Sequence, residues 1–113
     1  MEFTLSDTYR VVPRWKGNHE SDNPAVFICR YLTEAERTAI VGHKTRGIHL
    51  EVVTNLSELL RVSVVRIDNL WINGQEIKTV EQLLECRGII MLLNQVTNEI
   101  MANNIDPADI KKN

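Results

Sequence analysis

The side chains with the greatest chemical capacity in this chain are two cysteines and three histidines: Cys29, Cys86, His19, His43 and His49. A metal site needs ligands at close spacings such as Cys-x-x-Cys or His-Glu-x-x-His, and these residues show neither spacing. A nucleophilic thiol would have to be exposed, whereas Cys29 alternates with Phe27 and Tyr31 on an expected core face of a strand. We therefore expect no metal ion, no cofactor and no catalytic residue, and we predict that the protein is not an enzyme.

Phosphate-binding chemistry has no support either. The five glycines stand at positions 17, 42, 47, 74 and 88 and form neither a Gly-x-Gly-x-x-Gly turn nor a Gly-Lys-Ser/Thr loop. The acidic residues near positions 34–36, 81 and 85 fit helix starts and solvated helix faces. Nucleotide binding is therefore not expected.

A set of basic residues could form a nucleic-acid-binding face: Arg10, Arg14, Lys16, Lys44 and Arg46. Trp15 stands among them, and an aromatic ring beside cations can bind single-stranded nucleic acid by stacking and phosphate contact. Against this, the net charge of −2 and the pI of about 5.9 provide no general attraction for nucleic acid. A solvated strand face above a core that includes Trp15 explains the pattern more simply, so nucleic-acid binding is kept as the alternative hypothesis.

The elements that would carry these side chains begin with two alternating segments, residues 9–16 and 25–32, which predict an antiparallel hairpin. Pro13 favours an edge position for the first strand, and the polar residues 17–24 predict the connecting loop. Thr33 and Glu36 form a capping box that predicts a helix to about residue 41. Gly42 would end that helix, and residues 42–47 are expected to form a loop.

Residues 48–60 carry a mixed signal. Ile48, Leu50 and Val52 alternate as in a strand, but Ile48 and Val52 also continue into a helical face with three leucines at positions 56, 59 and 60. We predict a helix from about Leu50, with a strand over residues 48–54 as the alternative. Residues 62–72 are rich in β-branched side chains, and the Asn73-Gly74 pair that follows predicts a tight hairpin.

The last third of the chain is predicted to be helical. Thr79 to Gln82 repeats the capping box and predicts a short helix to about Cys86, after which Arg87-Gly88 interrupts it. Residues 89–103 then form the longest helical stripe, whose apolar members are Ile89, Leu92, Leu93, Val96 and Ile100. Additional apolar side chains widen this stripe, and methionine adapts well to varied partners. The predicted partner contacts are Ile90, Met91, Thr97 and Met101; a helix that is simply buried on two sides is the alternative.

The overall class follows from length and composition. A chain of 113 residues with 43% apolar and 25% charged residues fits one folded domain over residues 1–113, with flexible ends at 1–8 and 105–113. The longest apolar run, residues 89–93, is far below the roughly 20 residues of a membrane span. The acidic start and the two cysteines favour a cytoplasmic location. We predict an α+β fold, with a small antiparallel sheet of two hairpins packed with about four helices and a long C-terminal helix.

The order of the motifs resembles the small tail assembly chaperones of tailed bacteriophages. The motifs that carry the resemblance are Val12-Pro13-Arg14-Trp15, the run 24–30 leading into Leu32-Thr33-Glu34-Ala35-Glu36, the run 65–70 with the Asn73-Gly74 turn, Val80-Glu81-Gln82-Leu83-Leu84, and Asn98-Glu99-Ile100-Met101. The resemblance implies a non-catalytic protein in the bacterial host cytoplasm that binds the tape measure protein and helps to recruit tail tube subunits. Self-association would be compatible with this role.

Overall fold

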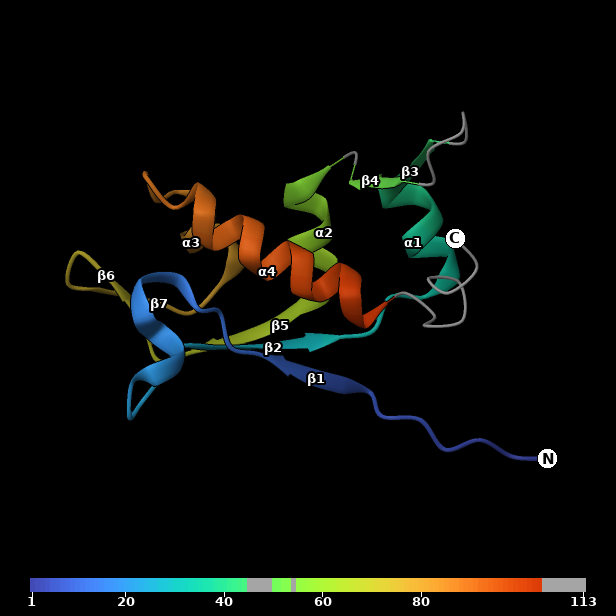
Figure 1. Ribbon diagram of the computed structural model, residues 1–113, viewed down its shortest axis with the longest axis horizontal. Helices are drawn as coiled ribbons and strands as arrows, with labels where there is room; N and C mark the ends of the chain where they lie inside the picture. The colour runs from blue at the N-terminus through green and yellow to red at the C-terminus, as the bar shows by residue number, and fades with distance from the viewer. Residues whose placement is uncertain (45–49, 54, 105–113) are drawn as a thin grey trace.

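The computed structural model of the protein describes residues 1–44, 50–53 and 55–104 (Figure 1). Helices and strands are interspersed along this part of the chain, and the sheets are antiparallel, which confirms the predicted α+β class. The predicted flexible segment 105–113 lies outside the described residues. Of the predicted flexible segment 1–8, residues 1–6 have no regular secondary structure and Thr8 begins the first strand.

The main sheet has three strands in the order β1-β2-β5, formed by Thr8–Val11, Val26–Arg30 and Val64–Asp68. β2 is the central strand because it pairs with both β1 and β5, and its Phe27 and Cys29 are fully buried in the core. Opposite Ile28 and Cys29, β5 contains one extra residue, Val65, which forms a β-bulge. The predicted hairpin of the first two strands is confirmed, with Val11 opposite Phe27.

The helices are α1 (Glu34–Ile40), α2 (Leu56–Ser63), α3 (Val80–Leu84) and α4 (Ile90–Asn103). Figure 1 shows α2 and α4 on one face of the main sheet, and none of the four covers the opposite face. The buried apolar side chains of the described elements form one cluster, to which β2, α2, α3 and α4 contribute Phe27, Leu59, Leu83 and Val96. The apolar stripe predicted for the last helix is the part of α4 that enters this cluster.

Both predicted capping boxes are present. The Glu36 backbone N–H donates to Thr33 Oγ1 over 3.1 Å, and the Thr33 N–H donates to Glu36 Oε1 over 2.9 Å. At α3, Gln82 N–H donates to Thr79 Oγ1 over 3.2 Å, and Gln82 Oε1 accepts from the Thr79 N–H. These short-range bonds satisfy amides that a helix start would otherwise leave unpaired, which is why four residues predict each start correctly.

The Asn73-Gly74 turn is also confirmed. It joins β6 (Leu70–Ile72) to β7 (Gln75–Ile77), and Asn73 and Gly74 have φ angles of 51° and 80°, as a type I′ turn requires. This hairpin is a separate two-stranded sheet rather than part of the main one. The separation occurs at Asn69, whose φ of 61° bends the chain between β5 and β6.

The predicted strand over residues 9–16 is too long. β1 ends at Val11, and Trp15–Glu20 forms a 3-10 helix, η1, in which Lys16 has a φ of 51°. Asn18 holds this connection closed because its amide donates to Pro13 O and Ala25 O, over 2.8 and 3.0 Å, and accepts from Ala25 N–H. The strand therefore stops where its partner β2 begins, and the polar residues after it fold back.

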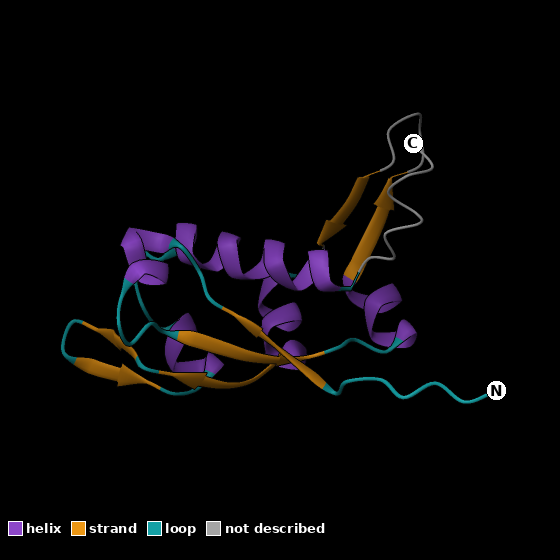
Figure 2. Ribbon diagram, turned by 60° about the horizontal axis from the view of Figure 1, so that its bottom comes forward, coloured by secondary structure: helices purple, strands orange, loops and turns teal. Residues whose placement is uncertain are grey.

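The predicted loop is wrong at residues 42–44 and the predicted helix is wrong at residues 50–53, where the strand alternative is confirmed; residues 45–49 and 54 lie outside the described residues. Val41–Lys44 forms β3 instead of a loop, so Gly42 does not end the preceding helix in the expected way, and Leu50–Val53 forms β4 instead of a helix. The two strands pair antiparallel, with Val41 opposite Val53, and they project from the rest of the protein (Figure 2). The helix begins only after Asn55, whose side chain accepts from Glu58 N–H. Residues 50–53 fit both a strand and a helix pattern, and pairing with β3 selects the strand.

Candidate protein-binding surface

The first turn of α4 exposes two large apolar side chains next to each other. Ile90 and Met91 are 60% and 58% exposed, whereas Ile89 before them and Leu92 after them are buried. Because successive helical residues are separated by about 100° around the axis, a helix that buries Ile89 and Leu92 turns the two residues between them outward. We call these two residues the Ile90–Met91 pair.

Further along α4 the outer face is polar. Asn94, Asn98 and Glu99 are exposed, and no other side chain on this helix is both large, apolar and exposed. The exposed large apolar side chains of α4 are therefore confined to its N-terminal turn.

Two of the four predicted partner contacts, Thr97 and Met101, are not exposed on α4. Thr97 is 3% exposed, and its hydroxyl donates within the helix to Leu93 O over 2.9 Å, so it cannot contact a partner. Met101 is half-buried and packs against the core. Thr97 and Met101 thus lie on the buried side of α4, and helical periodicity identifies that side only once the neighbours of the helix are known.

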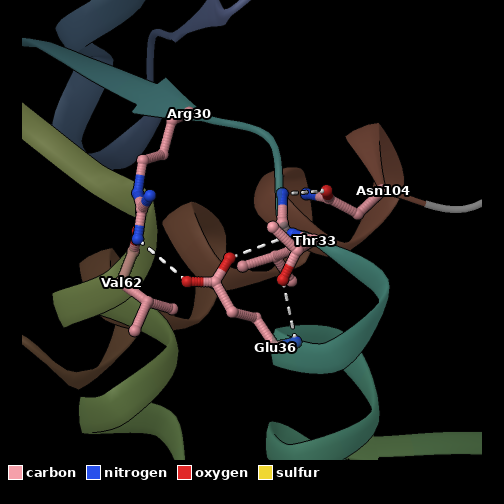
Figure 3. Close-up of polar contacts among 6 residues, drawn as sticks. Arg30, Thr33, Glu36, Val62 and Asn104 are labelled. Atoms are coloured by element: carbon pink, nitrogen blue, oxygen red, sulfur yellow. Dashed lines mark hydrogen bonds and ion pairs between the residues drawn. The ribbon is translucent and has the colours of Figure 1, made fainter.

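The C-terminal end of α4 is fixed by Asn104. Its Oδ1 accepts from the Leu32 N–H over 2.9 Å, and its Nδ2 donates to the Tyr9 hydroxyl over 3.2 Å and to Ile100 O over 2.7 Å. Figure 3 shows Asn104 reaching the segment between β2 and α1. One amide thus connects α4 to the edge strand and to the segment before α1, and it closes the helix at the same time.

A second polar contact joins α1, β2 and α2 beside it. Arg30 forms an ion pair with Glu36 over 2.9 Å, and its Nε donates to the Val62 carbonyl (Figure 3). The pKa of the Glu36 carboxyl is lowered, first by its hydrogen bond from the Thr33 backbone and then by the charge of Arg30. These contacts position α1 and α2 relative to β2.

Of the five predicted basic residues, the three from the first strand prediction, Arg10, Arg14 and Lys16, do not share one strand. Arg10 is exposed on β1, but Arg14 follows the end of that strand, and its backbone N–H donates to Gln95 Oε1 over 3.0 Å. Lys16 belongs to η1, where its Nζ lies 5.2 Å from the Trp15 ring centroid. Lys44 lies in β3 rather than in a loop, and Arg46 lies outside the described residues. The expected alignment of Arg10, Arg14 and Lys16 on a single strand is therefore wrong.

Both cysteines are at least partly buried in the described structure. Cys29 is fully buried, and burial raises the pKa of its thiol to about 12, so it stays protonated at neutral pH. Cys86 is half-buried at the end of α3, where its Sγ donates to Gln82 O over 3.5 Å. Among these residues, no three His, Cys, Asp or Glu side chains lie close enough together to hold a metal ion.

A shallow open depression of about 470 Å³ lies beside β5 and the β6–β7 hairpin, and residues 66–69, Glu76 and Lys78 line it. Its charged groups pair with one another, Arg66 with Asp68 over 3.0 Å and Lys78 with Glu76 over 3.6 Å. A small anionic or cationic ligand would have to displace these pairs, so the depression does not resemble a prepared ligand site.

Sequence reasoning overlooked other exposed apolar side chains: Met1, Phe3, Leu5, Tyr31, Val65 and Trp71. Trp71 is 62% exposed on β6. The first three alternate along residues 1–6, and this alternation is visible in the sequence, although such a short segment at the start of a chain is easily dismissed as a frayed end.

Comparisons with known protein families, with curated protein sequences and with solved structures find no match to this chain. Within the described residues, no helix has both the length and the apolar character that crossing a membrane requires.

Proposed function

We propose that this protein is a non-catalytic protein-binding module, and that the Ile90–Met91 pair is the centre of its contact with the partner. The observation that carries the proposal is the exposure of these two side chains, 60% and 58%, on a helix whose neighbouring residues are buried. Large apolar side chains that are adjacent and exposed on an otherwise polar helix face are typical of interaction sites.

The position of the pair favours binding. Leu92 and Leu93 anchor the first turn of α4 in the core, and Asn104 fixes the other end of the helix. A contact surface that is already ordered loses little conformational entropy on binding. The methionine side chain then adapts to the shape of the partner.

The proposed partner is a protein with an apolar helical stripe that would aggregate unless it is covered. The resemblance to tail assembly chaperones suggests the tape measure protein of a tailed phage, with tail tube subunits recruited afterwards. A long helical chain with exposed apolar stripes has the property that such a module would mask.

Co-expression of the protein with a tape measure protein tests the proposal. We expect a soluble complex, and we expect the Ile90→Glu/Met91→Glu variant to bind at least about tenfold more weakly, because interface residues of this kind contribute about 1–2 kcal/mol each. Acidic residues in a first helical turn interact favourably with the helix dipole, so the variant should still fold.

The matched control is Asn94→Glu/Asn98→Glu, which adds the same charge to the exposed polar part of α4. We expect it to bind as the unchanged protein does. The proposal is wrong if the unchanged protein forms no complex, or if both double variants bind equally well.

A further inference from the structure

Residues 1–6, here called the N-terminal arm, run away from the rest of the protein beyond the end of β1 (Figures 1 and 2). Met1, Phe3 and Leu5 are 110%, 76% and 81% exposed. Apolar residues at every second position are the pattern of a strand with one buried face. These three side chains form an exposed apolar face that nothing in the described structure covers.

The arm continues an edge strand whose outer edge is unpaired in the described structure, because the sheet order is β1-β2-β5. Asp7 O accepts from the Tyr31 N–H over 3.4 Å, so Asp7 directs its backbone groups toward β2. In an antiparallel ladder alternate residues point in opposite directions, and Thr8 and Arg10 therefore present their N–H and C=O groups to the open edge. Beyond Asp7, β2 turns into the segment before α1, and the arm loses its partner strand.

We propose that two copies of this protein pair through these segments, antiparallel and centred on Ser6, so that the arm of each copy extends along β1 of the other. Ser6 then lies opposite Ser6, Thr4 opposite Thr8, and Glu2 opposite Arg10. These residues carry the outward-facing backbone groups, which become the hydrogen-bonded pairs of the new ladder.

Side-chain chemistry supports this register. Phe3 comes to lie opposite Tyr9 and Met1 opposite Val11, on the face of the sheet where Val11 is buried and Tyr9 packs against the core. Aromatic and apolar cross-strand pairs of this kind stabilise a sheet. The exposed apolar face of the arm thus continues the core face of β1.

The opposite face gains a charge pair. Glu2 and Arg10 are both exposed, and neither has an ion-pair partner among the described residues. The register places them directly opposite each other twice in the dimer. A shift that centred the pairing on Asp7 would instead place two carboxylates opposite each other, which is destabilising.

The pairing joins the three-stranded sheets of two copies into one continuous sheet and covers both open β1 edges. It uses neither Ile90 nor Met91, so it is independent of the proposed partner contact. The Ile90→Glu/Met91→Glu variant is expected to dimerise like the unchanged protein, which keeps the failure of one proposal distinguishable from the failure of the other.

Engineered cysteines test the register. Hydrogen-bonded antiparallel pairs have a Cα separation of about 5.5 Å, which a disulfide can span. In a Cys86→Ser background, Ser6→Cys should therefore form a cross-linked dimer under mild oxidation. Thr4→Cys should not, because each Thr4 would lie four residues, about 13 Å, from its equivalent, whereas Thr4→Cys/Thr8→Cys should cross-link.

Charge exchange tests the interface in solution. By sedimentation velocity we expect the unchanged protein to dimerise, and Glu2→Arg or Arg10→Glu to raise the dimer Kd on the order of tenfold, because two like-charge pairs replace two opposite-charge pairs. The Glu2→Arg/Arg10→Glu double variant should return the Kd to within about threefold. Circular dichroism verifies that each variant is folded.

A protein that remains monomeric up to about 1 mM, where association would contribute only about −4 kcal/mol, overturns the proposal. Cross-linking of Ser6→Cys and Thr4→Cys to the same extent also overturns it, since the register would then be undefined. Binding of the arm only to a different protein, with no dimer, overturns it as well.

Discussion

Asn104 connects three parts of the protein that are distant in the sequence, and replacing it tests whether this connection stabilises the fold. Asn104→Ala removes three hydrogen bonds, to Leu32 N–H, to the Tyr9 hydroxyl and to Ile100 O. It leaves the partly buried Leu32 N–H and the half-buried Tyr9 hydroxyl without these partners. The packing of α4 against the sheet is otherwise unchanged.

Each protein hydrogen bond contributes a net of about 1 kcal/mol, and a buried donor left unpaired costs more. Water partly replaces Asn104 as a partner for the Leu32 N–H and the Tyr9 hydroxyl, which lowers the cost of the three lost hydrogen bonds. We therefore expect Asn104→Ala to lower the free energy of unfolding by about 2–3 kcal/mol. At this chain length that loss corresponds to a fall in Tm of roughly 8–12 °C.

Urea unfolding followed by circular dichroism measures the effect. The matched control is Asn103→Ala, whose neighbouring exposed amide makes one bond within the helix, to Glu99 O over 2.8 Å. We expect this control to cost about 0.5 kcal/mol or less. If the two variants lose equal stability, the contacts of Asn104 with Leu32 and Tyr9 do not stabilise the protein and the reasoning is wrong.

Three further predictions concern single residues. Ser63→Ala should be neutral or stabilising by up to about 1 kcal/mol in urea unfolding, because the Ser63 hydroxyl is fully buried and has no hydrogen-bond partner in the described structure; a clear loss of stability would indicate a partner that was missed. Gly74→Ala should cost about 1 kcal/mol because its φ of 80° disfavours a side chain; an unchanged Tm would contradict this. The lowered pKa of Glu36 stabilises the fold at pH values above the unfolded pKa of about 4.3. This contribution is lost as the pH falls through the folded value, so Glu36→Gln should be less stable than the unchanged protein at pH 7, and the difference should shrink toward pH 3; a difference independent of pH would refute it.

Local patterns predicted several elements well. The two capping boxes, the Asn73-Gly74 turn and the apolar stripe of α4 depend on residues within a few positions of one another, and the structure confirms each. The exposed Ile90 and Met91 were also identified from the sequence as possible contacts. Their exposure could not be predicted, because it depends on which side of α4 meets the sheet.

The errors occurred where two local patterns competed or where a partner was distant. Residues 50–53 have both strand and helix periodicity, and pairing with β3 decided for the strand. The first strand ends at Val11 because β2 begins only at Val26, and the turn closed by Asn18 occupies the residues between them. Thr97, a predicted partner contact, is buried.

The sequence by itself determined where most helices begin, where the tight turn lies, and that no spacing of cysteines, histidines or glycines prepares a catalytic, metal or phosphate site. Short-range hydrogen bonds and backbone preferences act between near neighbours, so they can be read locally. Only the tertiary structure decided that β2 lies between β1 and β5 and that Asn104 meets Tyr9. It also decided that Ile90, Met91 and the N-terminal arm remain exposed. These features depend on burial against residues far away in the chain, which periodicity alone does not specify.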